Sequence, residues 1–175
     1  GVKQILDAHS CGEQDSMTVG VGDAAYSNCG YIEPIYHKDN LISITRDRKN
    51  RAAYNIFSGD QKKVGRKRYY GEKVDLLDQK SQLTTHSITE FDNVSKKGNI
   101  TKVVLSEYKN LLVKGHKNHT MKDKPVNFIK TEVYDLEDNK IYKNDLLICV
   151  SGKNRNELSP KEVYDYADFE KYLLL

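Results

Sequence analysis

One aspartate in this chain stands where an α/β protein commonly places a catalytic carboxylate. Residues 17–28 read MTVGVGDAAYSN. Apolar side chains at alternate positions from residue 17 predict a β-strand, and Gly22 allows the backbone to turn after it. Asp23 would then lie at the carboxyl end of the strand, where open α/β sheets usually carry their ligands. Such a carboxylate could bind a divalent cation, but an Asp after a strand most often caps a helix or turn.

Glu170 is the residue that could complete a metal site with Asp23. Phosphodiester cleavage by two metal ions needs carboxylates from different elements, because two cations about 3.5–4 Å apart must be held by oxygen ligands. Glu170 is the only Glu in the second half of a helix predicted at the end of the chain. Together the two residues would hold Mg²⁺ or Mn²⁺. The alternative for Glu170 is a solvated side chain on the helix surface.

A basic segment supplies the candidate nucleic-acid contacts. The formal net charge is +3, yet residues 45–73 carry 10 basic and 3 acidic side chains. Arg and Lys bind phosphates, and Tyr can stack on an unpaired base. The predicted DNA contacts are Arg46, Arg48, Arg51, Lys62, Lys63, Arg66, Lys67, Arg68, Tyr69 and Tyr70. The alternative is a solvated charged loop.

A second, looser basic patch follows later in the chain. Its members are Lys109, Lys114, Lys117, Lys122 and Lys124. His116 and His119 lie within it at a spacing of three residues, but no further metal ligand accompanies them. We interpret both histidines as surface residues.

An α/β core must position these residues at the start of the chain. A strand at 17–21, a short helix or turn at 31–36 and a strand at 41–45 predict a parallel pair. Residues 52–150 read as a β-rich block. Within it, the Gly-containing turn 95–99 separates two strand patterns, and 126–136 pairs with 141–150 as a second hairpin.

The end of the chain predicts a helix. Ser159 as N-cap, Pro160 at the first helical position and Glu162 at the third form a strong helix start. The helix should run to about residue 174. The residues expected near one face are Val163, Tyr166, Phe169 and Leu173.

Cysteine content and hydropathy predict the compartment. Cys11, Cys29 and Cys149 are an odd number without a Cys-x-x-Cys pair, which suits a reducing compartment and gives no zinc site. No apolar run approaches the roughly 20 residues that span a bilayer, and no signal peptide opens the chain. We expect a cytoplasmic protein with no membrane contact.

Several segments together resemble the DDE transposases of bacterial insertion sequences. They are the strand-end Asp followed by AYS in 17–28, LISITR at 41–46, GRKRYYGEK at 65–73, NLLVKG at 110–115, Met121-Lys122 and RNELS at 155–159. The resemblance covers the chain from about Met17 to Tyr166. It implies a ribonuclease-H-like core interrupted by a β-rich insertion, and Mg²⁺-dependent cleavage and joining of strands at transposon ends. DNA is the implied partner, and the full-length family allows a homodimer.

The resemblance also assigns roles and divides the chain. It makes Asp23 the second of three metal-binding carboxylates and Glu170 the final one, although residues 166–172 lack the Arg that the family carries before this Glu. Asp7 and Asp15 do not follow an apolar strand, so no first Asp is identified. We expect the C-terminal part of a truncated catalytic domain that does not cleave DNA alone. Its predicted parts are a partial core at 1–51, a β-rich insertion at 52–158 and a core helix at 159–175.

Two other functions are compatible with the sequence. A non-catalytic DNA-binding β-rich domain derived from a transposase would keep the basic segment and lose the chemistry. An unrelated cytoplasmic interaction module would fit the composition but leave the collinear resemblance unexplained.

Overall fold

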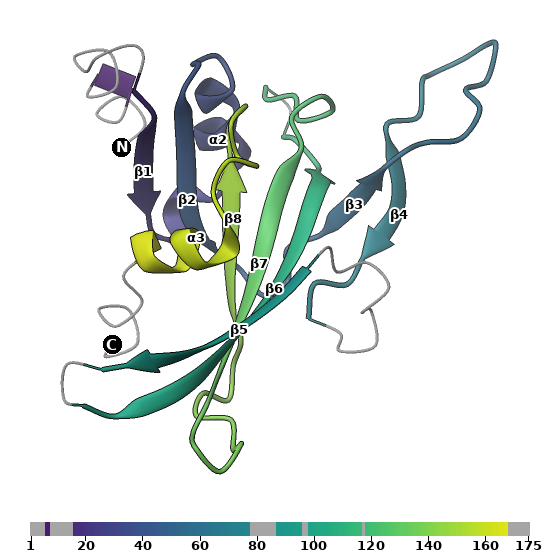
Figure 1. The fold of residues 1–175 in the computed structure, drawn as a ribbon. Coiled ribbons are helices and arrows are strands. Elements are labelled where there is room, and N and C mark those ends of the chain that lie inside the picture. The colour runs from purple at the N-terminus through teal and green to yellow at the C-terminus, as the bar shows by residue number, and fades with distance from the viewer. Residues whose placement is uncertain (1–5, 8–15, 78–86, 96–97, 117, 168–175) are drawn as a thin grey trace.

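A computed structural model describes residues 6–7, 16–77, 87–95, 98–116 and 118–167 (Figure 1). The described residues form an α/β fold in which eight strands share one mixed sheet. The predictions for Cys11, Asp15, Lys117, Phe169, Glu170 and Leu173 lie outside the described residues.

The elements follow one another along the chain with these bounds: β1 Thr18–Gly22, η1 Ala24–Tyr26, α2 Cys29–Ile35, β2 Leu41–Asp47, β3 Ala53–Ile56, β4 Tyr70–Val74, β5 Ser87–Val94, β6 Ile100–Val113, β7 Val126–Tyr134, β8 Leu146–Ser151 and α3 Pro160–Ala167. The strand order across the sheet is β1-β2-β8-β7-β6-β3-β4, and β5 pairs with the first half of β6.

The predicted parallel pair is confirmed. β1 and β2 are parallel, with Gly22 opposite Thr45, and α2 connects them. The β-rich middle of the chain is confirmed as well. β5 and β6 form the first predicted hairpin: the Ser95 N–H donates to the Asn99 carbonyl at 2.8 Å, and Gly98 has a φ of 82° that favours glycine. β7 and β8 form the second predicted antiparallel pair.

The first and middle parts of the chain share the sheet. β2 pairs with β8 in antiparallel register, with Ile44 opposite Val150. β8 in turn pairs with β7, and β7 with β6. The strands of the predicted core and of the predicted insertion are therefore joined by backbone hydrogen bonds.

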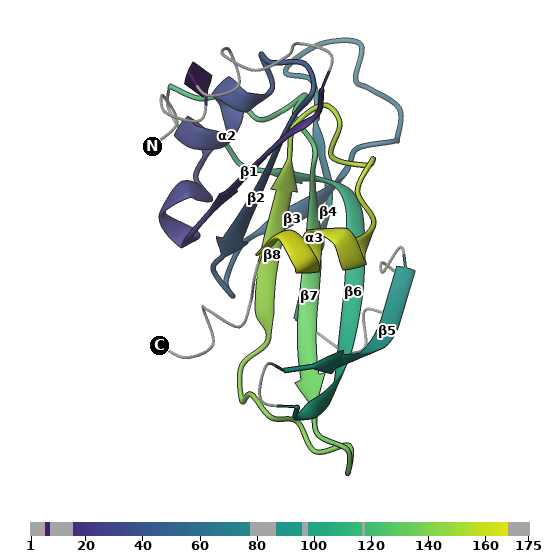
Figure 2. The ribbon, with the colours of Figure 1, turned by 60° about the vertical axis from the view of Figure 1, so that its left-hand side comes forward.

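The two faces of the sheet are covered by different helices (Figures 1 and 2). On one face, Tyr31, Ile32 and Ile35 of α2 pack in a cluster with Phe128 and Cys149. On the other face, the buried side of α3 packs against the strand residues that alternate with those of the first cluster. Together they form a second cluster. Both clusters are built by the two-residue alternation of strands, which directs successive side chains to opposite faces.

The start of α3 forms as predicted, but its buried face differs. The Ser159 hydroxyl and the Glu162 carboxylate are 2.7 Å apart, and the Ser159 N–H donates to Glu162 at 2.8 Å, as in a capping box. Val163, Tyr164 and Ala167 are the buried residues. Tyr166 was predicted on that face, but the helix turns it outward and it is 51% exposed.

In the part of the chain that the structure describes, no helix is long and apolar enough to cross a membrane.

Candidate nucleic-acid interface

A basic groove lies where the β3–β4 connection faces the β6–β7 connection. Its volume is about 770 Å³. Its cationic lining comes from two segments that are distant in sequence: Arg66, Lys67, Arg68, Lys114 and Lys122. None of these five side chains forms an ion pair with another described residue. Their charges are therefore available to an anionic ligand.

One wall of the groove is the connection between β3 and β4, which we call the basic arm (residues 57–69). Hydrogen bonds between Gln61 and Arg68 hold its two sides together. The side chain of Gln61 donates to the Arg68 carbonyl at 2.7 Å and accepts from the Arg68 N–H at 2.9 Å. The Arg68 guanidinium lies 4.6 Å from the ring centroid of Phe57, and its Nε donates to the Tyr70 carbonyl at 3.1 Å. Arg68 thus supports the arm as well as lining the groove.

The predicted base-stacking tyrosines are engaged by neighbouring side chains. The Lys122 ammonium lies 5.0 Å from the ring centroid of Tyr69. Tyr70 packs edge-on against Tyr54 at 5.5 Å, and the Lys114 ammonium lies 4.8 Å from the Tyr54 ring. Cation–π contacts of this kind hold a long, otherwise free lysine side chain in one region. The tyrosines therefore position cations in the groove, which favours binding of phosphates over stacking of bases.

The opposite wall is fastened to α2 through His119. The Nδ1 atom of His119 lies 2.7 Å from a Glu33 carboxylate oxygen, and the Thr120 N–H donates to the other oxygen at 3.3 Å. The hydrogen bond with His119 lowers the pKa of Glu33. A methyl group at Gly115 would overlap the His119 carbonyl oxygen, so this tight loop requires glycine. His119 lies at the surface as interpreted, with its side chain 38% exposed, and it also connects the loop to the helix.

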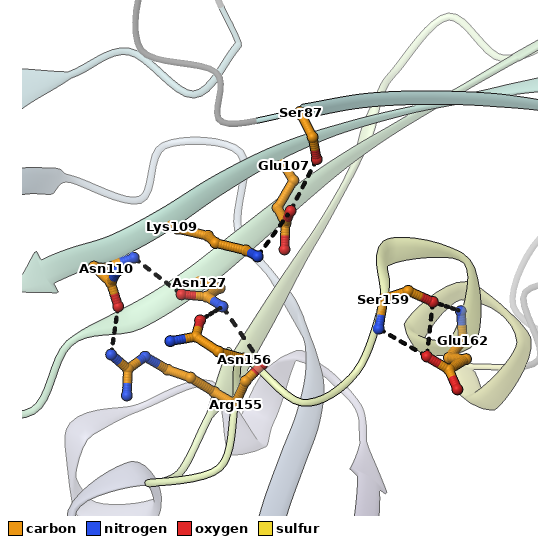
Figure 3. A network of polar contacts seen from close by, with 9 residues as sticks. All are labelled: Ser87, Glu107, Lys109, Asn110, Asn127, Arg155, Asn156, Ser159 and Glu162. Atoms are coloured by element: carbon orange, nitrogen blue, oxygen red, sulfur yellow. Dashed lines mark hydrogen bonds and ion pairs between the residues drawn. The ribbon is translucent and has the colours of Figure 1, made fainter.

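A β-bulge directs the end of β6 into the groove. The pairing of β6 with β7 shifts register between Tyr108 and Leu111, and Asn110 has a φ of 56°. Figure 3 shows the contacts that hold it. The Asn110 N–H donates to the Asn127 side-chain oxygen at 3.0 Å, and the Asn110 side-chain oxygen accepts from Arg155. This network fixes the backbone from which Lys114 enters the groove.

The ten predicted DNA contacts divide between two ends of the sheet. Because β2 is parallel to β1 and β6 runs antiparallel to both, the carboxyl ends of β1 and β6 lie at opposite ends. The residues from Arg66 to Tyr70 line the groove, whereas Arg46 and Arg48 are exposed at the carboxyl end of β2. Lys62 and Lys63 are exposed on the basic arm.

Arg51 has partners within the protein. Its Nε donates to the Asp47 carboxylate at 2.8 Å, and its Nη2 lies 2.7 Å from the Ser27 hydroxyl. The side chain of Asp47 is fully buried and that of Arg51 is 24% exposed. Arg51 therefore joins the end of β2 to the segment that follows η1.

A smaller basic cleft lies at the end of β2. Its volume is about 250 Å³, and Arg46, Lys49 and Lys143 supply its positive charge. Asp145, the carboxylate in its lining, is paired with Lys140. The cleft is too small for a typical organic ligand but has room for a phosphate group.

Asp23 lies at the carboxyl end of β1, as its sequence position predicts. Its side chain accepts the Ala25 N–H at 2.8 Å and caps η1. Asp47 at the same end of the sheet is bound to Arg51, so its oxygens are not free for a cation. Among the described residues no three metal-ligating side chains gather. These residues do not fit a two-metal site by themselves, and the role of Glu170 stays a prediction.

Comparison with known proteins gives no relative for this chain. No family model, no curated protein and no solved structure matches it.

Proposed function

We propose that this chain binds duplex DNA through the basic groove as part of a DDE-type transposase. The observation that carries the proposal is the meeting of two basic segments in one groove. Arg66, Lys67 and Arg68 lie on one side, and Lys114 and Lys122 line the other. A line of cations free of internal ion pairs matches the regular negative charge of a DNA backbone.

The resemblance to the transposases supplies the second half of the proposal. Three of the segments that resemble the transposases contribute residues to the groove. They are residues 65–73, 110–115 and 121–122. Under this proposal the sheet carrying β1 and β2 is part of a ribonuclease-H-like core. Strand cleavage and joining at transposon ends would use Mg²⁺, for which Asp23 is this chain's candidate ligand.

A non-catalytic DNA-binding domain derived from a transposase is the second candidate. The capping role of Asp23 and the ion pair of Asp47 with Arg51 favour it. Both candidates require the groove to bind DNA. They differ in whether Asp23 binds a metal ion.

The groove is tested by neutralising Arg66 and Lys67, the two groove cations of the basic arm that make none of the contacts that support the arm. The double variant Arg66→Gln, Lys67→Gln removes two charges and leaves Arg68 in place. Each phosphate contact contributes about 0.9 to the slope of log K against log salt, so the slope should fall by about two. Fluorescence anisotropy of a labelled duplex over a salt series measures both affinity and slope.

The matched control is Lys102→Gln, Lys161→Gln, which removes the same charge outside the groove. The side chains of Lys102 and Lys161 are 39% and 51% exposed, and both are paired with acidic side chains. The control should retain the wild-type slope within about half a unit. Equal slopes for the wild type and the groove variant would remove these residues from the interface and overturn the proposal.

A further inference from the structure

The tip of the basic arm presents an apolar side chain among cations. Val64 is 86% exposed, and Lys62, Lys63, Arg66 and Lys67 surround it in sequence. In Figure 1 the β3–β4 connection extends away from the sheet. A single exposed valine is common on protein surfaces, but one at the tip of a projecting, strongly basic loop is placed to meet a polyanion.

The geometry of the tip is narrow. The contacts between Gln61 and Arg68 close the arm just below it, and the chain reverses at Gly65. Gly65 has a φ of 103°, and a methyl group added there would meet no atom within 4 Å. The tip is therefore a short loop that is open on all sides and carries no bulky side chain at its turn.

We propose that this tip enters the minor groove of the duplex that the basic groove binds. The minor groove is about 6 Å wide, and proteins that enter it combine Arg or Lys with an apolar side chain placed against a base step. Val64 is the apolar side chain, and Arg66 is the cation that extends into the minor groove of the DNA. Lys62, Lys63 and Lys67 neutralise the phosphates on either side. The inference rests on the proposed function and adds the part of the duplex that is recognised.

A consequence is a preference for A·T pairs at the tip. In the minor groove, G·C differs from A·T by the exocyclic amino group of guanine, which projects into the groove. That amino group would meet Val64. A narrow A·T minor groove also has a more negative potential, which attracts an inserted Arg. The lysines on the flanks bind any sequence.

The experiment compares three duplexes that differ only in a central block. The blocks contain A·T, G·C or inosine·C pairs. Inosine lacks the minor-groove amino group of guanine and keeps the major-groove face of G·C. The chain should bind the A·T and inosine·C duplexes with similar Kd and the G·C duplex about five- to tenfold more weakly. If the inosine·C and G·C duplexes bind alike, the tip does not lie in the minor groove.

Val64→Ser is the matched variant, with Val94→Ser as its control. Val94 lies on β5 and is 62% exposed. A duplex with 2-aminopurine in the A·T block should become more fluorescent on binding the wild type and the Val94→Ser control, because the base step opens. Val64→Ser should lose most of that increase and reduce the preference over G·C to less than twofold. An unchanged preference and an unchanged fluorescence increase in Val64→Ser would overturn the inference.

The outcomes separate this inference from the proposed function. Failure of all three duplexes to bind would overturn both. Equal binding of all three, with the loss of salt slope in Arg66→Gln, Lys67→Gln, would leave the groove as the DNA site and overturn the minor-groove position of the tip. A tip that docks a protein would give this second result.

Discussion

At the scale of single residues, Asp23 decides between the two candidate functions. It caps η1 through the Ala25 N–H. Asn accepts the same hydrogen bond without a charge, so Asp23→Asn keeps the cap and removes the carboxylate. If Asp23 is a metal ligand, calorimetry will show weak Mn²⁺ binding by the wild type and none by Asp23→Asn. The two proteins should have equal thermal unfolding midpoints.

The control for the cap is Asp23→Ala, which removes both the charge and the hydrogen bond. It should lower the free energy of unfolding by about 1 kcal/mol. Equal Mn²⁺ heats for the wild type and Asp23→Asn would leave Asp23 with a capping role only, and would favour the non-catalytic domain.

The excess of positive charge in the basic segment predicts DNA contacts for Arg66 to Tyr70, and the structure places these residues in the lining of the groove. Their contact with DNA stays a prediction. The charge excess did not identify what those residues contact. Lys122 lies over Tyr69, and His119 is bonded to Glu33, 86 positions away. Contacts between residues so distant in sequence have no periodicity or spacing, so a single sequence carries no trace of them.

At the scale of elements, β7 and its connection to β8 depend on a buried carboxylate. Only 7% of the Glu132 side chain is exposed, and it is paired with Lys130 at 3.0 Å and Lys140 at 2.8 Å. Burial alone would raise the pKa of Glu132, but the hydrogen bonds from these two lysines lower it overall. Glu132→Gln leaves the buried Lys130 without its counterion. It should lower the free energy of unfolding by about 3 kcal/mol at pH 7, measured by urea denaturation.

The pH dependence of this loss has a definite sign. A carboxyl whose pKa is lower in the folded chain stabilises the fold above its unfolded pKa, and this contribution disappears as the pH falls through the folded pKa. The difference between wild type and Glu132→Gln should therefore shrink below about pH 4. Glu90→Gln is the control, since Glu90 is 54% exposed in its pair with Lys102 and should cost less than about 1 kcal/mol. A difference that is constant from pH 7 to pH 3 would contradict the assignment.

Elements defined by local patterns were predicted well. The alternation before Gly22, the turn at 95–99 and the capping box at Ser159 all act within a few residues. The pairing of β2 with β8 and the bulge at Asn110 were not predicted, because each depends on strands far apart in the chain. The bulge also changes which side chains of β6 face α2, so no single alternation describes that strand.

At the scale of the whole molecule, the groove and Asp23 lie at opposite ends of the sheet. β2 alone spans roughly 20 Å at about 3.3 Å per residue. A duplex seated in the groove would have to extend by several base pairs before it reached the end that carries Asp23, Arg46 and Lys49. Under the proposed function, affinity for DNA and any chemistry on DNA would therefore be carried by different parts of this chain, and the two can be measured separately.

This separation leads to the expectation that the chain binds DNA but does not cut it. The reaction of the resembling family needs metal ions held by three carboxylates. This sequence offers Asp23 and Glu170, and the structure commits the buried Asp47 to Arg51. Loss of metal ligands removes several kcal/mol of transition-state stabilisation, and each 1.36 kcal/mol is about tenfold in rate. Incubation with supercoiled plasmid and Mg²⁺ or Mn²⁺ should give no nicking beyond an Asp23→Ala control.

The same incubation should still retard the plasmid in a gel, and Arg66→Gln, Lys67→Gln should reduce that retardation. Binding without cleavage is the result that a groove distant from Asp23 predicts. Nicking above the Asp23→Ala control would instead mean that Asp23 has its full set of ligands in solution. Since α3 is described only to Ala167, the first variant to test in that case is Glu170→Gln. Its loss of nicking would place Glu170 beside Asp23 and would favour the transposase over the non-catalytic domain.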